Sequence, residues 1–293
     1  MSETTGAKKA ILSIVIGSYN RKPLLKKAIQ SVRDNAIKVS YEIIVVDGGS
    51  TDGSMEWLIT QKDVITIIQH NRGEFNGKPI ERRSWGYFMN LGFKSAQGRY
   101  ILMISDDCLL LPGAVNCGLD RFAELETQGR KVGGVAFYFR NWPSEKEYYI
   151  QKTLGGKLMV NHGLYSKQAM VEVGWLEEGK YIFYKADGDL CLKMWQAGYE
   201  IVDCPGAYVE HYYDSNESVR QTNHAVMEHD RQAYLKAWEG IYYYPDQTDQ
   251  RGKVTITYQD PHHLAEQLWQ DQQPAHSTIR RLGNKLRRKI GLS

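Results

Sequence analysis

Short apolar runs alternate with helical segments along the N-terminal third of the chain, and this alternation limits the fold more than any other feature of the sequence. The apolar runs are residues 10–16 (AILSIVI), 42–46 (EIIVV), 64–68 (VITII) and 100–104 (YILMI). Segments that we predict as helices lie between them, at residues 21–32, 54–60 and 84–96. Strands that alternate with helices form βαβ units. We therefore expect an α/β fold with a Rossmann-like, mostly parallel central sheet flanked by helices.

The pattern continues beyond residue 112. We predict further helices at residues 114–125 and 225–238, and one that opens at Asp187. Strands are expected at residues 132–139 and near 163, with short extended pieces at 200–203 and 207–209.

Carboxylates follow the predicted strands at the points where these strands end. Asp47 comes directly after the second strand, and Asp106 and Asp107 follow residues 100–104. In open α/β sheets ligands bind at the carboxyl ends of the strands. An aspartate after a strand can also cap the next helix. Carboxylate oxygens suit Mg²⁺ or Mn²⁺, and His211 is a candidate for a further ligand, although taken alone it is an ordinary packing or surface histidine.

Asp187 and Asp189 open a predicted helix. Carboxylates are favoured there by capping and by the helix dipole, which is a purely structural role. The same field keeps a carboxylate ionised, as a general base must be. The two interpretations are compatible.

Several function classes lack their sequence signals. No GxGxxG follows the first strand, and no Walker motif is present, which argues against a dinucleotide enzyme and a kinase or ATPase. The four cysteines form no CxxC pair, so we expect neither a zinc site nor a disulfide framework, and a reducing cytoplasm suits them best. No apolar run approaches the ~20 residues of a membrane span, and we expect no signal peptide.

Five motifs in a fixed order resemble the family 2 glycosyltransferases of the GT-A fold, over about residues 11–211. They are VIGSYNR, VVDGGSTDGS, SDD, KADGDLCLKMWQAGYEI and VEH. The resemblance implies an inverting transferase that uses a nucleoside-diphosphate sugar and a divalent cation, Mn²⁺ or Mg²⁺. It implies a domain at residues 1–215, with a nucleotide-sugar half at about 10–105 and an acceptor half at 106–215, followed by a helical extension at 216–293.

The resemblance also implies roles for single residues. Asp107 and His211 would bind the cation, and Asp187 would be the base, with Asp189 as its neighbour. Arg83, or Arg82 beside it, would contact a phosphate. The residues implied for the donor pocket are Ser18, Tyr19, Asn20, Asp47, Asp52 and Asp106.

The chain departs from the family pattern at two positions. Ser105 stands at the first carboxylate of the metal motif, and Ala186 stands where a glutamate is usual before the base. The assignment of the base between Asp187 and Asp189 therefore stays open. A binding module with a degenerate transferase fold is the alternative function. A nucleotidyltransferase would carry a glycine-rich loop with a basic residue after the first strand. It is disfavoured, because residues 17–21 contain one glycine, Gly17.

A basic amphipathic tail ends the sequence at residues 279–293. Its apolar positions, Ile279, Leu282, Leu286 and Ile290, recur at helical spacing. The segment also contains six Lys or Arg residues, largely on the other faces, and no acid. Such a helix is suited to lie on an anionic membrane surface, here the inner face of the plasma membrane. An enzyme held there would suit a glycan or lipid-linked glycan as its acceptor, as in polysaccharide assembly. The alternative is a helix whose apolar stripe packs on the protein. Nucleic acid is not an expected partner, because the rest of the chain is acidic. The net charge of the whole chain is +3, and the six basic residues of the tail exceed this total.

Overall fold

The four apolar runs form neighbouring parallel strands of one sheet in the computed structural model, which describes residues 10–212, 223–248, 250–259, 263 and 266. The strands are β1 (Leu12–Ser18), β2 (Tyr41–Asp47), β3 (Val64–Ile68) and β6 (Tyr100–Ser105). Their order in the sheet is β6-β1-β2-β3, and every pair is parallel. The predicted α/β class and parallel sheet are therefore confirmed.

Beyond β6 the sheet becomes mixed. β10 (Gly163–Ser166) runs antiparallel between β6 and β8 (Val132–Trp142). β9 (Tyr148–Lys152) and β12 (Gly252–Ile256) extend this side of the sheet. The long β11 (Glu200–Tyr212) pairs in parallel with β8 and antiparallel with the short β7 (Cys108–Leu110). A separate small hairpin consists of β4 (Glu74–Phe75) and β5 (Lys78–Pro79).

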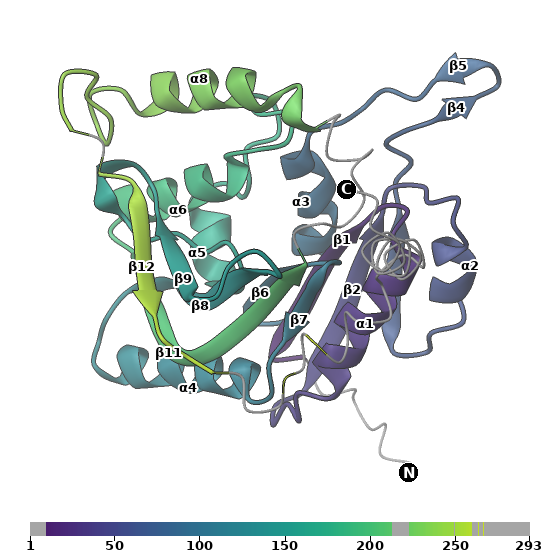
Figure 1. The fold of residues 1–293 in the computed structure, drawn as a ribbon, viewed down its shortest axis with the longest axis horizontal. Helices are drawn as coiled ribbons and strands as arrows, with labels where there is room; N and C mark the ends of the chain where they lie inside the picture. The colour runs from purple at the N-terminus through teal and green to yellow at the C-terminus, as the bar shows by residue number, and fades with distance from the viewer. Residues whose placement is uncertain (1–9, 213–222, 249, 260–262, 264–265, 267–293) are drawn as a thin grey trace, which may run out of the picture. The chain divides into compact units, whose positions relative to one another are not determined.

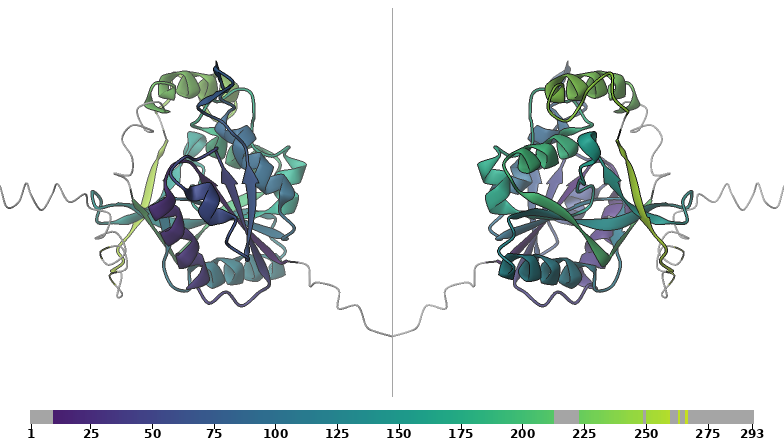
Figure 2. Two further views of the ribbon diagram at one scale, coloured as in Figure 1. Left: turned by 90° about the vertical axis from the view of Figure 1, so that its right-hand side faces the viewer. Right: turned by 90° about the vertical axis from the view of Figure 1, so that its left-hand side faces the viewer.

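Helices cover both faces of the sheet, and each face has its own apolar core (Figures 1 and 2). α1 (Lys22–Arg33), α2 (Ser54–Leu58) and α4 (Ala114–Thr127) contribute to one core. The other core contains side chains of α3 (Trp85–Ser95), α5 (Lys167–Glu172), α6 (Ala186–Gln196) and α8 (Met227–Trp238). A short 3₁₀ helix, η1 (Leu154–Gly156), follows β9. The loops that follow β1, β2 and β6 lie at the carboxyl ends of these neighbouring parallel strands.

Strand register brings the polar ends of these strands together. Ser18 pairs with Asp47 across β1 and β2, and Gly17 pairs with Ser105 across β1 and β6. Gly92 allows α3 to approach this part of the sheet, since a Cβ there would lie 2.6 Å from Val15 Cγ1. The residues just after Ser18, Asp47 and Ser105 therefore lie side by side at the carboxyl ends of these strands.

The chain divides into two compact units, Met1–Tyr258 and Gln259–Ser293. Residues beyond 215 contribute α8 and β12 to the first unit, where β12 pairs antiparallel with β9. The basic tail at residues 279–293 lies outside the described residues, so its predicted helix and membrane contact stay predictions. Among the helices described, none combines the length and the hydropathy that a membrane span requires.

Candidate functional site

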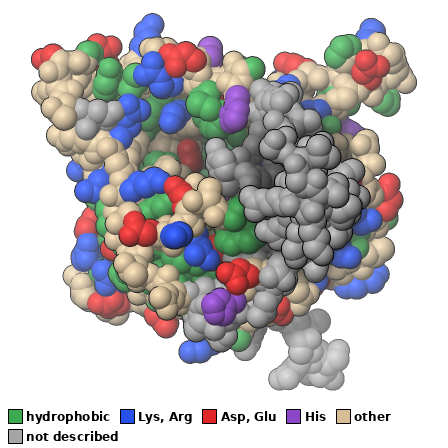
Figure 3. Space-filling model, in the orientation of Figure 1, with side chains coloured by type: hydrophobic (Ala, Val, Ile, Leu, Met, Phe, Trp, Pro, Cys, Tyr) green, Lys and Arg blue, Asp and Glu red, His purple; other side chains and the backbone are tan. Residues whose placement is uncertain are grey.

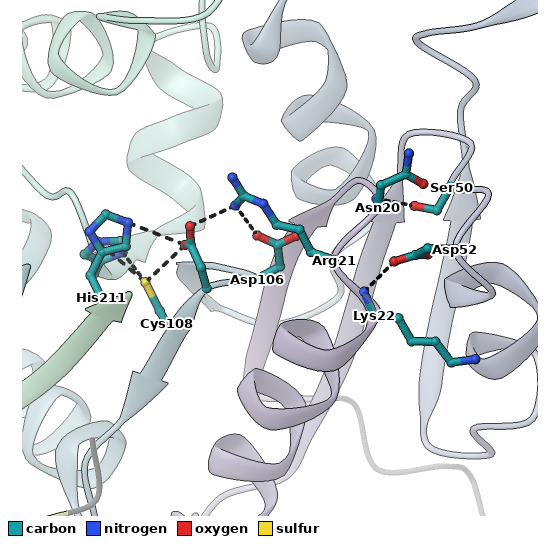
Figure 4. Close-up of polar contacts among 10 residues, drawn as sticks. Asn20, Arg21, Lys22, Ser50, Asp52, Asp106, Cys108 and His211 are labelled. Atoms are coloured by element: carbon teal, nitrogen blue, oxygen red, sulfur yellow. Dashed lines mark hydrogen bonds and ion pairs between the residues drawn. The ribbon is translucent and has the colours of Figure 1, made fainter. Parts of the chain in front are cut away.

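The two aspartates after β6 form one buried centre with an arginine from the turn that precedes α1. Asp106 and Asp107 are each only 3% exposed. Arg21 Nη1 donates to Asp106 Oδ1 at 2.9 Å and to Asp107 Oδ2 at 2.8 Å (Figure 4). Arg21 follows β1, whose parallel pairing with β6 brings the two turns together.

Burial and mutual repulsion shape the charges of this centre. Burial raises the pKa of Asp106 to about 6, opposed by Arg21 and reinforced by the charge of Asp107. Burial opposes the positive charge of Arg21 too, but the two carboxylates outweigh it and raise the pKa of the guanidinium. One guanidinium thus faces two carboxylates, so a second positive charge here would be favourable.

His211 lies on the side of Asp107 that faces away from Arg21. Its Nε2 is 3.5 Å from Asp107 Oδ1, because β11 places His211 opposite Cys108 on β7. His211 Nδ1 lies 2.7 Å from Asn141 Oδ1, its neighbour on β8. The amide oxygen only accepts hydrogen bonds, so Nδ1 is the donor in this contact and Nε2 is the ring nitrogen that faces Asp107.

Cys108 and His162 complete a polar cluster that the sequence did not indicate. Asp107, Cys108 and His211 offer donor atoms within 4.8 Å of one another, and His162 Nδ1 is 3.7 Å from Cys108 Sγ. Burial, with the nearby charge of Asp107, raises the pKa of the Cys108 thiol well above its usual value. Burial, with repulsion from His211, lowers the pKa of His162 to about 3. At neutral pH this cluster contains a thiol and a neutral imidazole.

The donor set that remains fits a hard divalent cation. A carboxylate oxygen and an imidazole nitrogen are ligands that Mn²⁺ accepts, whereas the buried thiol would have to lose its proton to bind a softer metal. Two donors about 2.1 Å from one ion and at right angles are about 3 Å apart. The 3.5 Å between Asp107 Oδ1 and His211 Nε2 is close to this spacing.

A cavity of about 520 Å³ opens over this centre. Seven of the residues predicted for the site line it, from β1, α6, β11 and the loops that follow β1, β3 and β6. They are Ser18, Tyr19, Arg83, Asp106, Asp107, Asp187 and His211. Residues separated by almost two hundred positions in the sequence are therefore neighbours around one cavity.

Three further predicted residues shape the turns beside this cavity and do not line it. Asp47 is fully buried, and its Oδ1 accepts from the backbone N–H groups of Gly49 at 2.9 Å and Ser50 at 2.7 Å. Asn20 Oδ1 accepts from Thr51 N at 2.7 Å. Asp52 accepts from Lys22 N at 2.8 Å (Figure 4). The donor-binding roles predicted for Asn20, Asp47 and Asp52 stay predictions.

Asp187 and Asp189 have different surroundings although both belong to the first turn of α6. Asp187 lines the cavity, and burial raises its pKa. Asp189 is 3% exposed, and its Oδ1 accepts from Tyr181 Oη at 2.9 Å and from Trp238 Nε1 at 3.0 Å. Its Oδ2 lies 3.4 Å from Lys193 Nζ on the same helix, and Asp189 is not among the residues that line the cavity. Its carboxylate therefore contacts α6, α8 and the loop before α6.

A second cavity, of about 570 Å³, meets the first at Asp187. Both cavities are lined by Gln151, Asn161, Tyr184, Lys185 and Asp187. We call the second cavity the basic groove, because its lining residues include Lys152, Lys185, Arg251 and Lys253. Figure 3 shows Lys and Arg side chains gathered on this face of the molecule, around a hollow.

Arginines after β3 line the first cavity, the one over Asp106 and Asp107. Arg72 and Arg82 both donate to Asn223 Oδ1, at 3.1 Å and 2.7 Å. Burial lowers the pKa of both guanidinium groups, and for Arg82 the nearby charge of Arg72 adds to this effect. Both remain cationic at neutral pH, so this wall of the cavity suits an anion. Arg83, the predicted phosphate contact, also forms an exposed ion pair with Glu81 at 3.2 Å.

α8 holds the loop that leads into α6. The fully buried Asp230 accepts hydrogen bonds from the backbone N–H groups of Ile182, Phe183 and Tyr184, at 2.8, 2.8 and 2.7 Å. The next residue, Lys185, has a φ of +77°. Neither Asp230 nor Arg21 has a local sequence signal for these contacts, because their partners lie far away in the chain.

Comparison with known proteins gives one family and several relatives. The model of the family described as "Glycosyl transferase family 2" matches residues 13–178, more than half of the chain. Asp187 and His211 lie beyond the matched residues. The chain is 28% identical over 176 residues to GalNAc(5)-diNAcBac-PP-undecaprenol beta-1,3-glucosyltransferase of Campylobacter jejuni, covering 60% of this chain and 52% of that protein. It thus spans about half the length of this relative.

A second curated relative and two solved structures extend the comparison. Over 127 residues the chain is 24% identical to a dolichyl N-acetyl-alpha-D-glucosaminyl phosphate 3-beta-D-2,3-diacetamido-2,3-dideoxy-beta-D-glucuronosyltransferase of Methanococcus voltae, covering 42% of this chain and 37% of that protein. The mannosyltransferase PcManGT of Pyrobaculum calidifontis, solved with GDP-Man and Mn²⁺, is similar with a TM-score of 0.56 and 16% identity, over 79% of this chain and 65% of that one. S. aureus TarS (residues 1–349) gives 0.50 and 15%, over 77% and 69%. These likenesses show a GT-A type fold.

Proposed function

Because the chain belongs to glycosyl transferase family 2, we propose that it is an inverting glycosyltransferase that moves a sugar from a nucleoside-diphosphate sugar to an acceptor hydroxyl. The first cavity would hold the donor, with its diphosphate near Asp107, His211 and the arginines Arg72 and Arg82. The basic groove would hold the acceptor.

The observation that carries this proposal is the position of Asp187 where the two cavities meet. A base must reach the acceptor hydroxyl while that hydroxyl faces the donor sugar. Asp187 takes the hydroxyl proton, the oxygen forms a bond to the anomeric carbon, and the bond to the nucleoside diphosphate breaks in the same displacement. Asp189 is less suited to this role, because Tyr181 and Trp238 already occupy its Oδ1.

A divalent cation, Mn²⁺ or Mg²⁺, would be held by Asp107 and His211 and would supply positive charge for the departing diphosphate. The carboxylate oxygen and imidazole nitrogen 3.5 Å apart support this choice. Asp106 would lie near the ribose or sugar, with Ser18 and Tyr19 beside the nucleotide.

The acceptor is proposed to be a glycan or a lipid-linked glycan. The names of the relatives from C. jejuni and M. voltae specify undecaprenol-linked and dolichyl-linked sugars. The basic tail at residues 279–293 would hold the enzyme at such acceptors, on the inner face of the plasma membrane, because the cytoplasmic leaflet carries the anionic lipids.

The test compares Asp107→Ala and Asp187→Asn with the unchanged protein. Nucleotide sugars are first screened for a rise in melting temperature with and without Mn²⁺, because a ligand that binds the folded state stabilises it. With the donor so identified, Asp107→Ala is expected to lose metal-dependent transfer. Asp187→Asn is expected to keep donor binding and to lose about 10²- to 10⁴-fold in turnover, the contribution of a general base.

Asp189→Asn serves as the comparison for Asp187→Asn. It is expected to lower the melting temperature through the lost contacts with Tyr181 and Trp238. An active Asp187→Asn enzyme would remove Asp187 as the base. Donor binding with neither transfer nor hydrolysis in the unchanged protein, even with Mn²⁺, would favour the binding module instead.

A further inference from the structure

The residues that line the basic groove carry an excess of positive charge, which the binding of a neutral sugar would not require. Among the described residues that line it, Asp187 is the only carboxylate beside the four cationic side chains. Lys253 is already paired with Glu145 at 2.7 Å. Lys152 and Lys185, in contrast, form no ion pair within the described ranges of the chain. Two lysines in a cavity whose only described carboxylate is Asp187 attract an anionic ligand.

The backbone at Lys185 gives an independent reason to assign a role to its side chain. Its φ of +77° lies in the left-handed region, which costs a non-glycine residue about 1 kcal/mol or more. Asp230 holds the three preceding backbone N–H groups, and Lys185 O accepts from Asp189 N at 2.8 Å. Glycine would adopt this conformation without strain. Lysine instead adds an ammonium group at the junction of the two cavities.

The position of these cations restricts the ligand. Lys152 and Arg251 line the basic groove but not the first cavity, whereas Lys185 lines both. Their charge is therefore beside the acceptor hydroxyl that Asp187 would deprotonate, and apart from the arginines of the proposed donor cavity. Lysine and arginine bind phosphate and carboxylate through charge-assisted hydrogen bonds, which neutral sugars cannot form as strongly.

We propose that the basic groove binds an anionic group, a phosphate or a carboxylate, carried by the acceptor sugar or by its immediate neighbour. This inference rests on the proposed transferase function and narrows its acceptor class. Two sources supply the same chemistry: the phosphate that joins a sugar to its lipid carrier, and the carboxylate of an acidic sugar in a glycan.

The test is calorimetric titration of the full chain, in EDTA and without donor, with three probes: glucose 1-phosphate, methyl glucuronoside and methyl glucoside. The anionic probes are expected to bind about tenfold or more tightly than methyl glucoside. The double variant Lys152→Gln/Arg251→Gln is expected to remove this preference. A stronger preference for the phosphate indicates the lipid-linked source, and one for the uronoside indicates an acidic glycan; both support the proposal.

Two control variants locate the binding. Lys38→Gln/Lys62→Gln removes the same charge from exposed positions that line neither cavity, and Arg82→Gln alters the first cavity alone. Both are expected to keep the preference for the anionic probes. Equal binding of the three probes, or a preference lost in Arg82→Gln and kept in Lys152→Gln/Arg251→Gln, would overturn the proposal.

The measurement needs neither metal nor turnover, so it separates the two proposals. Equal binding of the probes by an enzyme that transfers sugar would contradict the anionic acceptor alone. A clear anion preference in a protein that never consumes a donor would contradict the transferase function alone.

Discussion

Among single residues, Arg21 has the largest effect on how the site is organised. It contacts Oδ2 of Asp107, while His211 faces Oδ1 of the same carboxylate. The two oxygens of Asp107 are thus divided between a permanent cation and the proposed metal. Arg21 also contacts Asp106, so it keeps two buried carboxylates from facing each other without a counter-ion.

Replacing Arg21 with alanine is expected to make stability depend on the metal. Without a divalent cation the buried pair loses its guanidinium partner, which is expected to cost about 3 kcal/mol of unfolding free energy. Mn²⁺ should stabilise Arg21→Ala more than the unchanged protein, because it restores positive charge beside the two carboxylates. Thermal unfolding with MnCl₂ and with EDTA measures both effects.

Arg21→Lys provides the comparison, since it keeps the charge and is expected to lose less stability than Arg21→Ala. Equal gains in melting temperature from Mn²⁺ in Arg21→Ala and in the unchanged protein would show that the metal lies away from Asp106 and Asp107.

At the level of elements, α8 fixes the segment that carries the proposed base. Asp230 binds the backbone of residues 182–184, and Trp238 binds Asp189. Both contacts hold the N-terminus of α6, and with it Asp187, in one position. α8 lies beyond the residues that the family model matches, so this chain uses a segment outside the matched region to support its site.

Asp230→Asn is expected to lower stability in a pH-dependent way. Burial would raise the pKa of Asp230, but the three backbone N–H donors and His229 outweigh it and hold the pKa below the usual range. The ionised carboxylate therefore stabilises the fold above about pH 4, and this contribution is lost as pH falls through the lowered folded-state pKa. Asp230→Asn should cost about 2 kcal/mol at pH 7.

Urea unfolding of Asp230→Asn and the unchanged protein across acid and neutral pH measures this difference, which should shrink toward low pH. Turnover should fall as well, since residues 182–184 lead directly to Lys185. Glu228→Gln, which breaks an exposed pair with Arg231 on the same helix, is expected to change little. A difference that grows as pH falls would contradict the role given to the Asp230 carboxylate.

Local sequence patterns predicted the strands β1, β2, β3 and β6 and the helices between them, but not β7, β9 or β12, nor the contacts between distant elements. Residues 64–68 form β3 as expected, and Asp106 and Asp107 lie where a strand end was predicted. β12, in contrast, pairs with β9 about a hundred residues away, and Arg21 meets Asp106 across a separation of 85. Periodicity shows which face of an element is apolar, but it contains no information on the register of distant partners.

For the whole molecule, charge is unevenly distributed along the sequence. The full chain has a net charge of +3, while residues 279–293 alone contain six basic residues and no acid. The remainder is therefore net negative, and an anionic membrane would repel it while attracting the tail. This asymmetry would orient the enzyme on a membrane whose lipid-linked sugars are the proposed acceptors.

Deleting residues 279–293 is expected to abolish binding to anionic vesicles and to leave the donor-binding site unchanged. Each basic residue near such a surface contributes about 1 kcal/mol, so the intact chain should sediment with phosphatidylglycerol vesicles at low salt and dissociate as salt is raised. Neutral phosphatidylcholine vesicles should bind neither protein.

Leu282→Ser/Leu286→Ser keeps every charge and removes two residues of the apolar stripe, so it should bind weakly and release at lower salt. If the truncated chain binds vesicles as well as the intact one but melts at a lower temperature, the apolar stripe packs on the protein and the membrane contact is wrong.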